Sequence, residues 1–161
     1  MCDRREHARI ADRRSAGIAD GIGCGDNTKA ALITRAIKEI CMLGVKMGGH
    51  METFFGLSGI GDLIVTCASV HSRNRRAGFL IGQGRTMEEA MQEVHMVVEG
   101  VYSAKAALGL AEKYGVALPI IEQVNAVLFE GKSPVQAMND LMMRDKKIEI
   151  TDDIEWEKPD R

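Results

Sequence analysis

The positions of the apolar residues along the chain predict helices almost throughout. Between Asp26 and Met47, apolar side chains recur every three to four residues and form one stripe at helical spacing. Leu, Ile, Met and Ala supply most apolar positions, while aromatic residues make up only 4% of the chain. No convincing hairpin signal interrupts the helical pattern. We therefore predict an all-α fold, a multi-helical bundle of about seven or eight helices.

Capping residues predict where several of these helices begin. Thr86 and Glu89 have the spacing of a capping box, which marks a helix start. Ser133 followed by Pro134 is an N-cap followed by a first-turn proline, and Pro119 suits the first turn of another helix. These signals predict three helix starts in the second half of the chain.

The two ends of the chain are predicted to be less regular. Residues 1–16 carry many arginines without clear periodicity, so we interpret them as an unrelated or disordered segment. The glycines in 17–25 lack the G-x-G-x-x-G spacing of a dinucleotide loop, and we expect a mobile loop with Asp26 or Asn27 capping the next helix. Residues 17–145 then form the helical domain. The charged residues 146–161 form a flexible tail.

Composition and charge limit the partners. With 161 residues the chain has the length of a single domain. Its 21 basic and 23 acidic residues give a net charge of −2, which argues against nucleic acid. No run approaches the ~18 apolar residues of a membrane span, and the N-terminus lacks a signal-peptide core. The four cysteines and four histidines have no metal-ligand spacing. We expect no metal, reduced thiols and a cytoplasmic location.

A cluster of polar residues, SRNRR, is one candidate site. Ser72 can cap a helix, which places Arg73 and Asn74 in its first turn, where free backbone N–H groups and the helix dipole attract anions. The same dipole disfavours an arginine there, and a phosphate gripped by that arginine would remove the conflict. A solvated basic turn is the alternative.

A second candidate is Asp62, which precedes the apolar run 63–65. A carboxylate beside apolar residues costs free energy unless it is paired or caps a helix. Asp62 is therefore either an ordinary N-cap or a group that orients a lysine or a substrate hydroxyl. Thr66 lies one helical turn later and faces the same way, so the two side chains could line one wall of a polar pocket.

Four blocks of sequence resemble a known family. The blocks are GDNTKAALITRAIKEI, ETFFGLSGIGDLIVTC, SRNRR and MVVEGVYSAKAA. In the same order they resemble the C-terminal half of bacterial NAD(P)-dependent glycerol-3-phosphate dehydrogenase, over roughly residues 17–143. The resemblance implies a helical domain like the C-terminal domain of the 6-phosphogluconate dehydrogenase-like superfamily. It also implies hydride transfer, with NAD or NADP, between dihydroxyacetone phosphate and sn-glycerol 3-phosphate.

The resemblance implies roles for the candidate residues. Asp62 matches the aspartate that orients the catalytic lysine and the substrate, and Thr66 matches its polar neighbour. Ser72, Arg73 and Asn74 match the substrate-binding triplet. Within that triplet, Arg73 and Asn74 are placed on the phosphate, and Arg73 is also placed near the cofactor.

The chain departs from the family before residue 17. Before residue 17 the sequence has no strand, G-x-G-x-x-G turn and helix of a Rossmann domain. Val97 and Glu99 nevertheless match positions of the family that touch the cofactor from the helical side. Counting back without gaps from Gly17, the position of the catalytic lysine holds Arg9, and arginine scarcely gives up a proton.

We therefore expect the chain alone to be inactive as an enzyme. Two other hypotheses remain open. One is a non-catalytic helical module that forms a homodimer or complements a separate Rossmann chain. The other is a gene fragment whose apolar surface is exposed to solvent. None of these hypotheses involves nucleic acid or insertion into a membrane.

Overall fold

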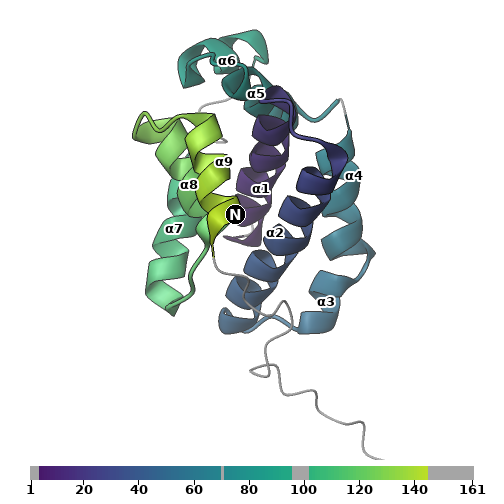
Figure 1. Cartoon of the computed structure of the whole chain (residues 1–161). Helices are drawn as coiled ribbons and strands as arrows, with labels where there is room; N and C mark the ends of the chain where they lie inside the picture. The colour runs from purple at the N-terminus through teal and green to yellow at the C-terminus, as the bar shows by residue number, and fades with distance from the viewer. Residues whose placement is uncertain (1–3, 70, 96–101, 145–161) are drawn as a thin grey trace, which may run out of the picture.

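The computed structural model describes residues 4–69, 71–95 and 102–144, with side chains from Arg13 onward apart from Ser58. Every regular element within these ranges is helical, which confirms the all-α prediction. Figure 1 shows the elements in order: α1 (Arg4–Gly21), α2 (Asp26–Lys46), α3 (Met51–Phe55), the π-helical turn η1 (Leu57–Gly61), α4 (Asp62–Ala68), α5 (Arg73–Gly82), α6 (Met87–Glu93), α7 (Ser103–Tyr114), α8 (Pro119–Phe129) and α9 (Pro134–Met143).

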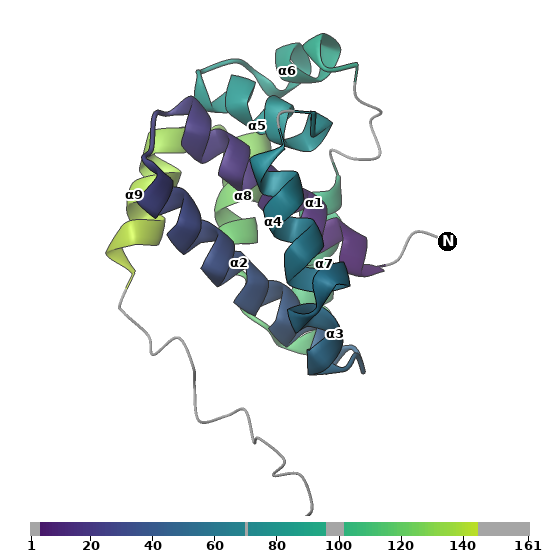
Figure 2. The ribbon, with the colours of Figure 1, turned by 90° about the vertical axis from the view of Figure 1, so that its right-hand side faces the viewer.

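Helix α1 is the central element of the bundle. It runs between α2 and α4 on one side and α7, α8 and α9 on the other (Figure 1), and α4 lies alongside it in the second view (Figure 2). Its second half is buried, with Ala16, Ile18 and Ala19 in the core. The segment 1–16, which we predicted to be unrelated or disordered, is therefore helical from Arg4. Its buried last turns supply the apolar contacts that hold it in place.

Two of the glycines that we expected in a mobile loop, Gly17 and Gly21, belong to a helix crossing, whereas Gly23 and Gly25 lie in the turn between α1 and α2. Gly17 and Gly21 lie four residues apart on one face of α1, and Gly78 and Gly82 lie four apart on α5. A Cβ atom on any of the four would overlap the backbone of the other helix. We call this contact the α1/α5 crossing. The loop prediction failed here because glycine spacing allowed two backbones to approach closely, which outweighs the low helix propensity of glycine.

Most of the predicted helix starts are confirmed. The Ser133 hydroxyl accepts from the third residue of α9, and Thr86 and Glu89 form both hydrogen bonds of a capping box at α6. Pro119 occupies the first turn of α8, as predicted. The start of α2 differs, because Gly25 is its N-cap and makes no side-chain cap, while Asp26 lies in the first turn.

The stretch 51–68 qualifies as a membrane span by length and composition, with a mean hydropathy of 1.2 over 18 residues, unlike our sequence prediction. It is not one helix, because the backbone at Gly56 is extended between α3 and η1. Phe54, Leu63 and Cys67 from this stretch are buried in the protein core. Length and composition are therefore weak evidence for crossing a membrane.

Candidate functional site

Asp62 is held by an arginine of α1. Its carboxylate oxygen Oδ2 lies 2.6 Å from Nη2 of Arg13, and its side chain stays 43% exposed. The N-cap of α4 is Gly61, whose backbone is already helical as part of η1, so the N-cap interpretation of Asp62 is wrong. The pairing with a guanidinium offsets the cost of placing a carboxylate before an apolar run.

Thr66 lies on the same side of α4 as Asp62. Its hydroxyl donates to the backbone carbonyl of Asp62 and lies 3.4 Å from the carboxylate oxygen Oδ1. The carboxylate thus has one oxygen engaged by Arg13 and the other beside a hydroxyl group. The one-turn spacing predicted this proximity, because residues four apart on a helix are neighbours.

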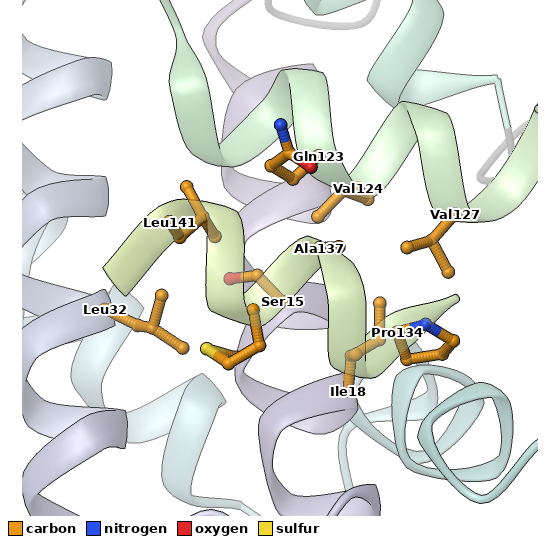
Figure 3. Close-up of a pocket in the computed structure, with 10 residues that line it drawn as sticks. Ser15, Ile18, Leu32, Gln123, Val124, Val127, Pro134, Ala137 and Leu141 are labelled. Atoms are coloured by element: carbon orange, nitrogen blue, oxygen red, sulfur yellow. The ribbon is translucent and has the colours of Figure 1, made fainter. Parts of the chain in front are cut away.

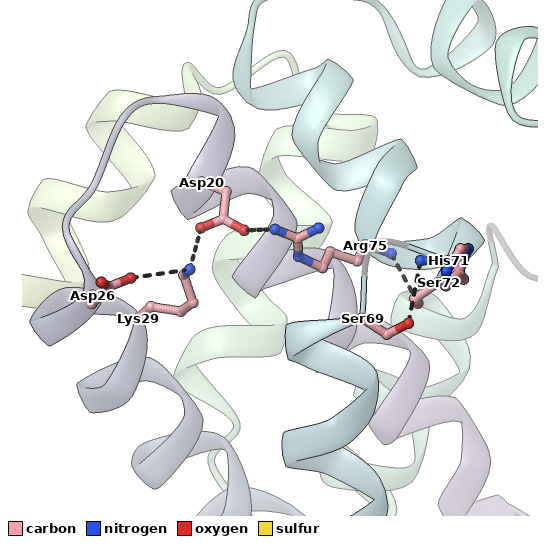
Figure 4. A network of polar contacts seen from close by, with 7 residues as sticks. All are labelled: Asp20, Asp26, Lys29, Ser69, His71, Ser72 and Arg75. Carbon is pink, nitrogen blue, oxygen red and sulfur yellow. Dashed lines mark hydrogen bonds and ion pairs between the residues drawn. The ribbon is translucent and has the colours of Figure 1, made fainter.

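The SRNRR turn opens α5, and its second arginine is structural. The Ser72 hydroxyl accepts from the backbone N–H of Arg75 at 3.3 Å, which confirms the predicted N-cap. The guanidinium of Arg75 turns away from this open end to Asp20 of α1 (Figure 4). Asp20 also pairs with Lys29 of α2 at 2.7 Å. Arg75 therefore ties α5 to α1 and α2.

The other two arginines of the turn differ in their partners. Arg76 lies 3.7 Å from Glu93 with both side chains largely exposed, so the pair contributes little. Arg73 is exposed, and within the described part of the chain it makes no ion pair or side-chain hydrogen bond. Arg73 is thus the arginine of the turn whose guanidinium remains available to an anion.

Asn74 is held by a second arginine of α1. Its side-chain oxygen Oδ1 accepts from Nη2 of Arg14 at 3.3 Å. Arg14 is buried at 2% exposure, and this burial lowers its pKa to about 10, so it still carries its charge at neutral pH. Arg13 and Arg14 are neighbours in the sequence, and they reach α4 and α5 respectively. Helix α1 therefore links the two candidate regions that the sequence singled out.

Sequence reasoning missed Arg13 and Arg14 because it assigned both to an unrelated segment. One signal could have found them. Two arginines directly before the small residues Ser15, Ala16 and Gly17 are unusual at the start of a tightly packed helix face. A buried arginine in such a place needs a hydrogen-bonding partner.

A partly open pocket of the bundle, between α1, α2, α8 and α9, is not part of this site (Figure 3). Its volume is about 20 Å³, which is room for about one water molecule and too little for a phosphoester. Its lining is almost wholly apolar and comes from α1, α2, α8 and α9: Ser15, Ile18, Leu32, Gln123, Val124, Val127, Pro134, Ala137, Met138 and Leu141.

Several predicted residues cannot be placed. Val97 and Glu99 lie outside the described residues, as does the tail 146–161. Arg9 belongs to α1, but its side chain is outside the described ones. Within the described ranges, no group of three His, Cys, Asp or Glu side chains could hold a metal ion. The same ranges contain no strand, so they do not form the strand–turn–helix unit that holds a dinucleotide.

Comparison with known proteins shows the family to which the chain is similar. The family described as NAD-dependent glycerol-3-phosphate dehydrogenase C-terminus matches residues 14–139. Glycerol-3-phosphate dehydrogenase [NAD(P)+] of Fusobacterium nucleatum is 71% identical over 136 residues, which cover 84% of this chain and 41% of the relative. The enzyme of the same name from Agathobacter rectalis is 67% identical over 142 residues, covering 88% and 42%.

Solved structures show the same helical arrangement. The crystal structure of glycerol-3-phosphate dehydrogenase from Coxiella burnetii matches with a TM-score of 0.84 and 37% identity, over 88% of this chain and 44% of that one. The yeast enzyme from Saccharomyces cerevisiae matches with a TM-score of 0.74 at 24% identity, which shows the fold alone. This chain thus spans about two-fifths of the length of its curated relatives. It belongs to the family of C-terminal domains of NAD-dependent glycerol-3-phosphate dehydrogenase.

Proposed function

We propose that this chain is the substrate-binding part of a glycerol-3-phosphate dehydrogenase, the oxidoreductase that interconverts dihydroxyacetone phosphate and sn-glycerol 3-phosphate. The observation that carries this proposal is the link through α1. Arg13 holds Asp62, and the adjacent Arg14 holds Asn74 in the SRNRR turn. A carboxylate and an anion-attracting helix start are thereby anchored to one rigid element.

The two regions suit the two ends of a three-carbon phosphoester. The phosphate end fits the first turn of α5, which holds the exposed Arg73, the Asn74 amide and backbone N–H groups after the Ser72 cap. The carbonyl or hydroxyl end fits Asp62 and Thr66. Such an arrangement fixes the substrate in position before the reaction.

The cofactor is assigned to this chain only in part. The proposal keeps Arg73, Val97 and Glu99 as residues that touch NAD or NADP from the helical side. Because the described residues lack a dinucleotide-binding unit, we assign no step of hydride transfer to them. We expect the isolated chain to show no reduction of dihydroxyacetone phosphate with either cofactor. We place the chain in the cytoplasm, where cysteine side chains stay reduced.

Calorimetric titration with sn-glycerol 3-phosphate tests the proposal. We expect Arg73→Ala to weaken binding at least tenfold, because it removes a charge-assisted hydrogen-bond donor from the phosphate. Arg76→Ala is the matched control, since it removes one arginine of the same turn whose ion pair among the described residues is with surface Glu93. Its affinity should stay within about twofold of the unmodified chain. Equal affinity of Arg73→Ala and the unmodified chain would eliminate the role of Arg73.

A second candidate is a helical module that dimerises or complements a separate nucleotide-binding chain. It is favoured by the exposed apolar side chains around α3 and α4, where Phe55 is 55%, Leu57 91% and Val65 69% exposed. Apolar groups gathered in this way mark a surface that a partner covers. Sedimentation of the purified chain separates the two: a concentration-dependent dimer that binds no sn-glycerol 3-phosphate favours the module.

A further inference from the structure

We infer that α1 prepares the candidate site for an anion, with Arg13 and Arg14 as its positioning residues. Arg13 sets the charge at Asp62, and Arg14 sets the direction in which Asn74 offers its donors. This inference rests on the proposed function. It extends that function, because neither arginine was among the residues that the sequence assigned to substrate.

Arg13 removes an electrostatic conflict. A phosphate monoester carries up to two negative charges, and a bare carboxylate nearby would repel it. The Arg13 guanidinium lies 2.6 Å from Oδ2 of Asp62 and is itself only 12% exposed, whereas Asp62 is 43% exposed. The cation thus lies on the protein side of the pair and the carboxylate on the solvent side. Oδ1 of Asp62 lies beside the Thr66 hydroxyl, and the net charge of the Arg13–Asp62 pair is zero.

Arg14 fixes which end of the Asn74 amide faces outward. A guanidinium can only donate hydrogen bonds, so Asn74 must turn its oxygen toward Arg14. The amide nitrogen, with two donors, is then left for a ligand. Phosphate oxygens only accept, so this orientation suits a phosphate and disfavours a cation. The burial of Arg14 shields this contact from water and makes an unpaired guanidinium costly there.

The α1/α5 crossing makes this positioning rigid. Gly78 of α5 lies against the backbone carbonyl of Arg14 with no room for a Cβ atom. The distance between the Arg14 backbone and α5 at Gly78 is therefore set by direct backbone contact. Two arginines on such a helix can hold Asp62 and Asn74 with little loss of side-chain entropy on binding.

Arg13 also limits the proton chemistry of this site. The family match begins at residue 14, and Arg13 lies one helical turn after Arg9, which the resemblance aligns with the lysine. In this chain the described cation on Asp62 is thus a guanidinium, which stays charged and does not deliver a proton. The site that we infer binds and orients a phosphoester without acting as an acid.

A first experiment needs no ligand. In NMR spectra of the full chain, Arg14→Met should shift the side-chain amide resonances of Asn74, because it removes the donor on its oxygen. Arg13→Ala should likewise shift the carboxyl ¹³C resonance of Asp62, and Arg13→Lys should restore part of that shift. If both sets of resonances stay unchanged, the positioning inference is wrong, whatever the chain binds.

A second experiment titrates sn-glycerol 3-phosphate, with inorganic phosphate as a second probe. We expect Arg13→Ala to weaken binding of both about tenfold and Arg13→Lys to stay within about threefold of the unmodified chain. Asn74→Asp keeps a partner for Arg14, so the fold is preserved, but it replaces two donors by acceptors. It should weaken binding at least tenfold.

The outcomes separate the inference from the proposed function. If Arg73→Ala loses binding while Arg13→Ala and Asn74→Asp bind as the unmodified chain does, the inference fails and the proposed function stands. If the unmodified chain binds neither probe, the proposed function fails, and the ligand-free spectra decide the inference.

Discussion

Two buried helix contacts of this protein are built from opposite chemistry. At the α1/α5 crossing, four glycines leave no side chain between the two backbones where they meet, and the backbones touch. Where α2 meets α8, a long ionisable side chain enters the core instead. Glu39 of α2 is only 6% exposed, and its Oε1 accepts from the backbone N–H of Ile120 at 2.8 Å.

The two contacts differ in how the backbone N–H and C=O groups of their helices find hydrogen-bonding partners. The first turn of α8 has unpaired N–H groups, and Glu39 accepts one of them from another helix. At the four glycines of the α1/α5 crossing the contact depends on shape, because the backbone groups of each helix are hydrogen-bonded within that helix. We therefore expect added atoms to damage the first contact and removed atoms to damage the second.

The largest effect is expected for Gly78→Ala. The new Cβ would overlap the carbonyl oxygen of Arg14, and a backbone atom cannot rotate away as a side chain can. We expect the free energy of unfolding to fall by about 3 kcal/mol, at the upper end of overpacking effects. Urea denaturation followed by circular dichroism measures this loss. A loss below about 0.5 kcal/mol would show that the helices separate easily.

A smaller effect is expected when Glu39 is shortened. Glu39→Ala leaves the N–H of Ile120 buried without a partner, which should lower the free energy of unfolding by about 2 kcal/mol. Glu39→Gln keeps a carbonyl acceptor of the same length, so it should lose much less. Equal losses in the two variants would mean that packing volume, and not the hydrogen bond, explains the contribution of Glu39.

The same residue predicts a pH dependence with a definite sign. Burial raises the pKa of Glu39 from its ordinary 4.5 to about 8. The backbone N–H groups of Ile120 and Ile121 lower this pKa in part. The nearby charges have smaller effects: Glu122 raises the pKa and Arg144 lowers it. Between these values the folded chain holds a proton that the unfolded chain has lost. The contribution of Glu39 to stability is therefore full below about pH 4.5 and is lost as the pH rises toward about 8. Glu39→Gln should flatten this slope, and an unchanged slope would assign it to other groups.

The smallest effect, and of opposite sign, is expected for Gly109→Ala in α7. An added Cβ there meets no atom within 4 Å, and the residue is exposed. Alanine should raise the free energy of unfolding by about 0.5–1 kcal/mol, because glycine is the poorer helix former. This variant is the matched control for Gly78→Ala. If both variants destabilise the chain equally, close contact does not explain the glycines of the α1/α5 crossing.

Local signals predicted much of the fold and part of the site. Caps such as Ser72 and the pair Thr86 and Glu89 act within four residues, so the sequence alone locates them. Asp62 and Thr66 were likewise predicted to face the same way from helix spacing. The glycines Gly17 and Gly21 were misjudged, because their low helix propensity is a local signal and the helix contact that they permit is not.

The sequence by itself determined the helical class, most helix starts and the candidate residues at Asp62 and in the SRNRR turn, since each depends on spacing within a few positions. Only the tertiary structure decided which arginine of that turn stays available, because Arg75 finds Asp20 at a separation of 55 residues. It likewise decided that Arg13 and Arg14 hold Asp62 and Asn74, at separations of 49 and 60 residues. A charged side chain takes whichever partner the packed backbone brings within reach, and helical periodicity carries no information about contacts at that distance along the chain.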